Sequence, residues 1–110
     1  MMEKRKDRRY TTQLHVQLDA GSKTTWGVLG DVSENGLFIK TTRDIDLDSS
    51  IDIVIFLPDN TYSHLTGIVK RKVELTDTHR KYGLGIQIIK KDERYMKLLS
   101  VSYIGQKRIA

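Results

Sequence analysis

Two short stretches of the chain carry side chains that could bind an anion and a polar base. The first, residues 31–36, reads Asp-Val-Ser-Glu-Asn-Gly. Asp31 and Ser33, two apart, point to the same side of an extended segment, and Gly36 lets a ligand come close to the backbone. The same pattern is typical of a hairpin turn in which Asn35-Gly36 takes positive φ and the polar side chains satisfy turn amides. The stretch alone leaves a binding site and a structural turn both open.

The second stretch lies at the N-terminus, where five basic residues stand against two acids over residues 1–9. Arg5 and Arg9 are four apart, a spacing that returns to one face both on a helix and in an extended arm. A guanidinium can bind phosphate bidentately, stack on a base and donate two hydrogen bonds to the O6/N7 edge of guanine. We therefore expect the two arginines to converge on one anion, with a solvated tail as the alternative interpretation.

Strands must position these stretches, because the dominant period of the chain is two. The alternating segments, separated by turn residues, are 13–19, 24–31, 36–40, 51–57, 64–75 and 82–89. In the fifth segment Leu65, Val69, Val73 and Leu75 are expected to share the buried face. The sequence predicts an all-β domain, a six-stranded antiparallel β-barrel, since closure removes exposed strand edges.

The pattern changes near the C-terminus, where residues 92–105 are predicted to form an α-helix. Asp92 can cap its start and Gly105 can stop it. A helix that packs its apolar face onto the barrel is expected, and a docking helix for a partner is the alternative. The apolar residues predicted on one helical face are Tyr95, Met96, Leu99 and Tyr103.

Length and composition fit one domain of 110 residues, divided into a basic arm (1–12), a barrel (13–91) and the helix (92–105). There is no cysteine and no long apolar run, so we expect no disulfide, no membrane span and a cytoplasmic location. The three histidines lack metal-ligand spacing, and no nucleophile–base pair can be named. We expect no metal site, no cofactor, no catalytic residues and no enzymatic activity.

The two stretches in order, Arg5-x-x-x-Arg9 and then Asp31-x-Ser33-x-x-Gly36, resemble the motifs of the PilZ domain, a bacterial receptor for cyclic di-GMP. The resemblance extends over most of the chain and implies a six-stranded barrel whose N-terminal arm folds over the ligand. It also implies that Arg5 and Arg9 contact the phosphates and guanines, and that Asp31 accepts hydrogen bonds from a guanine. Ser33 would bond to the ligand nearby, and Gly36 would shape the turn.

The function predicted from this resemblance is a cyclic di-GMP receptor or adaptor that relays the signal to a protein partner in motility, pilus or exopolysaccharide systems. A small basic barrel that binds single-stranded nucleic acid is one alternative. The acid-rich segment from Asp44 to Asp52 weighs against it, and Trp26 and Phe38 are expected to pack in the barrel, not to serve as stacking platforms. The other alternative is a PilZ-like adaptor that does not bind nucleotide.

Overall fold

The computed structural model describes residues 10–11, 13–76 and 81–100. The arginines predicted for the arm, Arg5 and Arg9, and the predicted helix residues Tyr103 and Gly105 lie outside this part of the chain. Within it the strands are β1 (Tyr10–Thr11), β2 (His15–Ala20), β3 (Lys23–Val32), β4 (Gly36–Thr41), β5 (Ser50–Phe56), β6 (Tyr62–Glu74) and β7 (Tyr82–Lys90).

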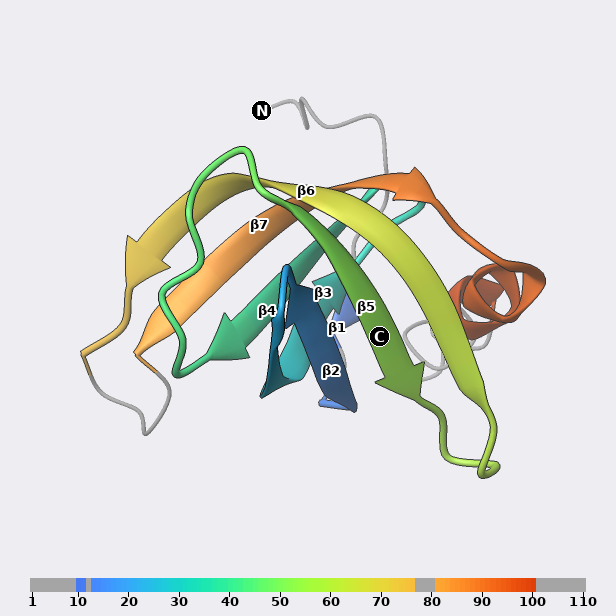
Figure 1. The fold of residues 1–110 in the computed structure, drawn as a ribbon. Helices are drawn as coiled ribbons and strands as arrows, with labels where there is room; N and C mark the ends of the chain where they lie inside the picture. The colour runs from blue at the N-terminus through green and yellow to red at the C-terminus, as the bar shows by residue number, and fades with distance from the viewer. Residues whose placement is uncertain (1–9, 12, 77–80, 101–110) are drawn as a thin grey trace, which may run out of the picture.

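Six of these strands, β2 to β7, close into an antiparallel barrel (Figure 1). The order is β3-β2-β5-β6-β7-β4, and the pairing of β3 with β4 completes the circle. The short β1 continues the edge of β3 beyond β2, with Tyr10 opposite Val32 and Thr11 opposite Asp31. The prediction of a six-stranded antiparallel β-barrel followed by a helix is confirmed.

Alternating apolar side chains fill the barrel interior, as the period of two predicted. On β5, for example, Ile51, Ile53 and Ile55 are buried while Asp52 between them is exposed. Each buried aliphatic side chain of this size contributes about 1.5–3 kcal/mol through removal of apolar surface from water. The other apolar strand residues that are fully enclosed are Val16, Leu18, Leu29, Val32, Ile39, Leu65, Val69 and Leu84.

A β-bulge in β3 turns Asp31 away from the interior. The register with β4 shifts by one residue between Leu29 and Asp31, so Gly30 is the extra residue. Leu29 and Val32 are both completely buried although three positions separate them, and Asp31 is only half-buried. Strict alternation from Leu29 would have placed the Asp31 carboxylate in the core, where an unpaired charge is very costly.

A second bulge, in β6, changes which residues face solvent beyond Val69. The register with β7 shifts between Val69 and Arg71, leaving Lys70 as the extra residue. Lys70 and Arg71 are consequently both exposed, although they are neighbours in one strand. The phase change also corrects the predicted buried face, because Val73 is 37% exposed and Leu75 is only half-buried.

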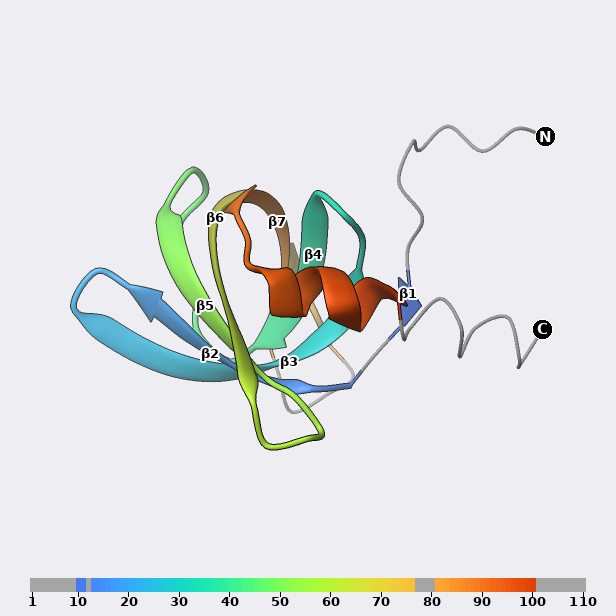
Figure 2. The ribbon, with the colours of Figure 1, turned by 90° about the vertical axis from the view of Figure 1, so that its right-hand side faces the viewer.

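A helix packs across one end of the barrel, and its described part spans residues 93–100 (Figure 2). Tyr95 and Leu99, four apart, are buried in the core cluster, and Leu98 packs partly against it. Met96 is 41% exposed, which contradicts its predicted place on the buried face. It follows Tyr95 by one position, so it lies about 100° around the helix from the side that meets the barrel.

Asp92 fastens the helix to the barrel. Its Oδ1 accepts hydrogen bonds from the Tyr95 amide at 3.0 Å and from the Ser63 hydroxyl at 2.6 Å, and its Oδ2 accepts one from the His64 amide at 2.9 Å. The first bond is the N-cap predicted from the sequence. Burial of the carboxyl works to raise its pKa, but the three hydrogen bonds outweigh this effect, so the pKa of Asp92 lies below its ordinary value.

This depressed pKa predicts acid sensitivity of the helix attachment. The ionised Asp92 contributes stability above the unfolded-state pKa of about 4, and the contribution is lost as the pH falls through the lower folded-state pKa. We expect the stability of Asp92→Asn to fall less steeply than that of the wild type between about pH 5 and pH 2. Urea unfolding at a series of pH values measures both slopes, and equal slopes would contradict the assignment. Asp92→Ala should cost about 1 kcal/mol at neutral pH.

Candidate functional site

A cavity of about 360 Å³ lies on the outer surface of the barrel, over the ends of β3 and β4 and the middle of β6 and β7. It adjoins both bulges described above, one on each side. Its mixture of side chains includes one carboxylate and two cations. The lining residues are Asp31, Gly36, Leu37, Phe38, Lys70, Arg71, Gly85, Ile86 and Gln87.

Two glycines form part of the cavity wall and leave backbone exposed to a ligand. A Cβ on Gly36 would lie 3.3 Å from the Ile86 carbonyl oxygen, and a Cβ on Gly85 would lie 3.1 Å from the Arg71 Cβ. Gly36 is the first residue of β4 and does not have positive φ, and neither does Asn35, so the predicted left-handed turn is wrong. Gly36 is needed for close approach to β7, not for an unusual turn.

The cavity carries charges of both signs. Asp31 from β3 is negative, and Lys70 and Arg71 from β6 are positive. Lys70 lies 3.9 Å from the Asp48 carboxylate, but both side chains are largely in solvent, at 52% and 82% exposure. An ion pair this exposed contributes little, so it leaves the Lys70 ammonium able to bind another anion. The carboxylate therefore offers hydrogen-bond acceptors, and the two cations offer positive charge that can bind phosphate.

Sequence reasoning missed Lys70 and Arg71 as candidate site residues. The signal was present as the run Lys-Arg-Lys at 70–72, in which three consecutive charges interrupt an alternating strand. An uninterrupted strand would have sent Arg71 into the core beside Val69. The bulge resolves that conflict by placing both cations outside.

Ser33 lies in the turn that borders the cavity and is 6% exposed. Its hydroxyl accepts a hydrogen bond from the Gly36 amide at 3.1 Å and donates to the Gly36 carbonyl at 3.3 Å. This is the turn-satisfying arrangement that the sequence left open as an alternative for this residue. Ser33 is not among the cavity-lining residues, whereas Asp31 and Gly36 are.

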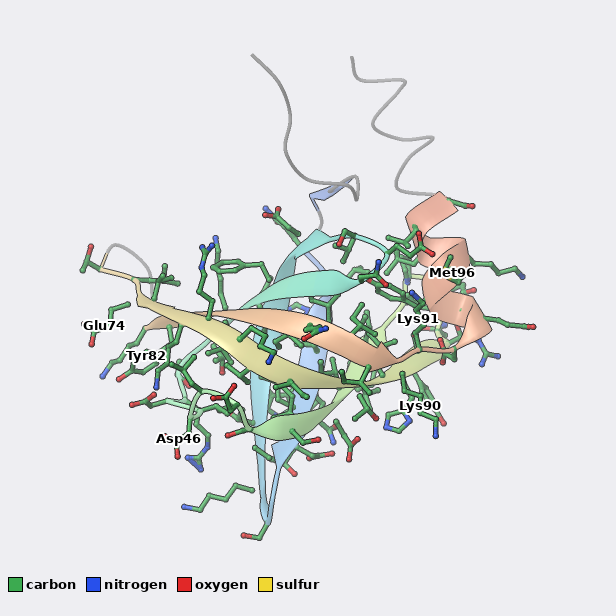
Figure 3. The ribbon with its side chains drawn as sticks, turned by 90° about the horizontal axis from the view of Figure 1, so that it is seen from above. Asp46, Glu74, Tyr82, Lys90, Lys91 and Met96 are labelled. Carbon is green, nitrogen blue, oxygen red and sulfur yellow. The ribbon has the colours of Figure 1, made fainter. Side chains whose placement is uncertain are left out.

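The same turn is bonded to the C-terminal helix. The Tyr95 hydroxyl donates to the Ser33 carbonyl at 2.5 Å, in a buried contact between residues 62 positions apart. Lys91, labelled beside the helix in Figure 3, donates from Nζ to the Glu34 carbonyl at 2.6 Å. The Ile88 amide also donates to the Asn35 carbonyl at 2.9 Å. Strand, turn and helix thus form one hydrogen-bonded unit beside the cavity.

Of the aromatic side chains predicted to pack in the barrel, Phe38 lines the cavity and Trp26 lies on a different part of the surface. Trp26 is 58% exposed and stacks on Phe56 with ring centroids 5.6 Å apart, so the prediction that it packs in the interior is wrong. Phe38 is half-buried and covers Gly83, where a Cβ would meet its ring. Trp26 is in β3 and Phe56 in β5, on either side of β2, so neither lines the cavity.

A closed six-stranded barrel, a terminal helix and a cavity beside an Asp-x-Ser-x-x-Gly turn define a small ligand-binding barrel domain. The sequence model of the PilZ domain matches residues 3–105, nearly the whole chain. The chain therefore belongs to the PilZ domain family. Among curated proteins, none matches it.

Several solved structures share the fold. The Bacillus subtilis inhibitor of motility MotI/DgrA superposes with a TM-score of 0.81 at 15% identity, over 97% of this chain and 53% of that one. The K. pneumonia MrkH–c-di-GMP complex gives 0.79 at 17% identity, over 99% and 56%. The PilZ domain of Escherichia coli YcgR with c-di-GMP gives 0.72 at 11% identity, over 97% and 95%. This chain thus spans about half the length of the first two proteins and nearly all of the third.

The described residues lack the features of two other kinds of site. No helix there is long and apolar enough to cross a membrane. The same part of the chain holds no group of three or more His, Cys, Asp or Glu side chains that could bind a metal ion.

Proposed function

We propose that this domain is a receptor for cyclic di-GMP and that the cavity on β3, β4, β6 and β7 is its binding site. One observation carries the proposal: the cavity combines a carboxylate at Asp31, glycine backbone at Gly36 and two adjacent cations. Family membership and the two solved PilZ proteins that contain c-di-GMP support the choice of ligand.

Each feature suits one part of the ligand. The Asp31 carboxylate can accept hydrogen bonds from the N1 and N2 donors of a guanine, which adenine lacks in that arrangement. Lys70 and Arg71 can offset the two phosphate charges, and Gly36 and Gly85 leave room for the flat bases against the backbone. We assign Ser33 two roles: it holds the turn, and it contacts the ligand at the edge of the turn.

Arg5 and Arg9 complete the proposed site from the N-terminal arm. The described chain starts at Tyr10, whose partner in β3 is Val32, directly beside Asp31. Arg9 directly precedes Tyr10, and the five Cα–Cα steps from Arg5 to Tyr10 can span at most about 17 Å. The arginines are therefore tethered within reach of the cavity, where they can bind phosphate and the guanine edge.

Within this proposal residues 1–12 form the arm, 13–91 the barrel and 92–105 the helix. The domain acts by binding and carries the signal to a protein partner in a motility, pilus or exopolysaccharide system. Closure of the arm over the dinucleotide would change the surface that the domain presents to its partner, so that this surface depends on ligand concentration.

Isothermal titration of cyclic di-GMP into the purified protein tests the proposal. We expect binding at micromolar or tighter concentration, and a loss of at least about tenfold in Arg5→Ala and Arg9→Ala, because each removes a charge-assisted bidentate contact. Arg43→Ala is the matched control, because Arg43 lies on the 42–49 loop outside the cavity. Absence of heat with folded wild-type protein, or equal affinity of all variants, would overturn the proposal. Tight, salt-sensitive binding of single-stranded RNA instead would favour the nucleic-acid alternative.

A further inference from the structure

We propose that a groove between the loop at residues 57–61 and the C-terminal helix docks an acidic, apolar segment of the partner protein. This inference rests on the proposed function only in assuming that the domain signals to a partner. The groove has a volume of about 340 Å³. Its lining residues are Leu57, Pro58, Asp59, Thr61, Arg94, Lys97 and Leu98.

The groove combines an apolar floor with positive charge. Leu57, Pro58 and Leu98 supply the apolar surface, which suits an inserted aliphatic or aromatic side chain. Arg94 and Lys97 are three apart on the helix and therefore lie on neighbouring positions of one face. Neither of them forms an ion pair with any other residue in the described ranges.

The one carboxylate in the groove is already engaged. The Oδ1 of Asp59 accepts hydrogen bonds from the Thr61 hydroxyl at 2.5 Å and the Thr61 amide at 3.1 Å. These bonds, the side-chain one foremost, lower the pKa of Asp59 and keep it ionised. Two cations thus face one satisfied carboxylate, and the groove retains net positive charge toward an acidic ligand.

Two segments of this chain are poor occupants. Residues 101–110 contain Lys107 and Arg108 and no acid, so their charge does not complement the groove. The acidic loop that contains Asp46 lies at the end of the molecule opposite the helix (Figure 3), so it cannot reach the groove of its own chain. In a second copy this loop would be partly neutralised, because Asp44 bonds to Lys72. A partner segment with free acids fits better than either.

The groove is connected to the proposed nucleotide site through the helix. Arg94 and Leu98 line the groove, while Tyr95 is buried and donates to the Ser33 carbonyl in the turn beside Asp31. Lys91, just before the helix, bonds to the same turn. A ligand that shifts this turn will bias the position of the helix and hence the shape of the groove, and the coupling is reciprocal.

Selection of a random dodecapeptide phage library on the full chain, with and without cyclic di-GMP, tests the groove. Enriched peptides are then synthesised with a fluorophore and titrated by anisotropy. We expect acidic sequences with two or more large apolar residues, and about tenfold weaker binding to the Arg94→Glu/Lys97→Glu double variant because the charge complementarity is reversed. The matched control is Lys23→Glu/Lys81→Glu, which reverses two exposed lysines outside the groove and should bind like the wild type.

The outcomes separate the alternatives. The proposal that the groove docks an acidic segment would be overturned by any of three results: failure to enrich peptides, enrichment of basic peptides, or equal binding to both double variants. Binding lost in Trp26→Ser instead would assign docking to the Trp26–Phe56 surface and also overturn it. The link to the turn predicts that cyclic di-GMP changes peptide affinity in the wild type and not in Tyr95→Phe. If the wild type fails to bind cyclic di-GMP in calorimetry, the proposed function falls while the charge-reversal result still decides the groove.

Discussion

Replacing Tyr95 with alanine is expected to lower the free energy of unfolding by about 3–5 kcal/mol. Among the described residues the Tyr95 side chain is the largest that is fully enclosed, at 0% exposure, and it extends from the helix into the core. The substitution would leave a cavity and would also remove the donor to the Ser33 carbonyl. Urea unfolding followed by circular dichroism measures the loss.

Two variants separate the contributions of the Tyr95 ring and its hydroxyl. Tyr95→Phe keeps the ring and leaves the Ser33 carbonyl without its phenol donor, for which we expect a loss of about 1–2 kcal/mol. Tyr62→Ala removes a tyrosine that is 59% exposed and should change stability by only about 0.5 kcal/mol. A Tyr95→Ala loss as small as that of Tyr62→Ala would show that the helix is not needed to complete the core.

The second large effect concerns ligand binding, where Asp31→Ala should weaken cyclic di-GMP affinity by about 30-fold or more. A hydrogen bond to a charged acceptor contributes about 1.5–3 kcal/mol, and a carboxylate can take two such bonds from one guanine. Asp31→Asn retains one acceptor and should fall between the alanine variant and the wild type. Calorimetric titration of the three proteins provides the comparison.

The control for Asp31 is Asp46→Ala. Asp46 is an exposed aspartate on the acidic loop, outside the cavity, so its removal changes the net charge equally without touching the proposed site. Unfolding curves of both variants confirm that each is folded. Equal affinity of Asp31→Ala and Asp46→Ala for cyclic di-GMP would show that the Asp31 carboxylate does not contact the ligand.

Alternation of apolar residues was sufficient to predict the barrel, because nearly every interior position is filled by an aliphatic residue at even spacing. It could not predict the bulges in β3 and β6 that border the cavity. A bulge depends on the register between partner strands, and in β3 the evidence for it is that Leu29 and Val32 are both buried. For the same reason Val73 was misassigned to the interior. The local sequence gives the alternation of buried and exposed residues, whereas the neighbouring strands determine where a bulge shifts that alternation by one residue.

The candidate site was only partly predictable for the same physical reason. Asp31 and Gly36 were identified because they lie close in sequence, and the structure places both on one cavity. Lys70 and Arg71 come from a strand more than 30 positions later and reach the cavity only through the barrel closure and the β6 bulge. The spacing of residues within one stretch does not show which distant strand will lie beside it.

The pairing of β1 with β3 has a kinetic consequence. Only Tyr10 and Thr11 hold this strand, opposite Val32 and Asp31, while the barrel itself is closed without it. Fraying of these two residues costs far less than global unfolding, so β1 can detach from β3 and reattach many times during the lifetime of the folded barrel. If Arg9 binds the ligand as proposed, its covalent link to this anchor would keep its effective concentration at the cavity in the millimolar range typical of short tethers. Capture of a ligand would then be a fast local event that leaves the barrel intact.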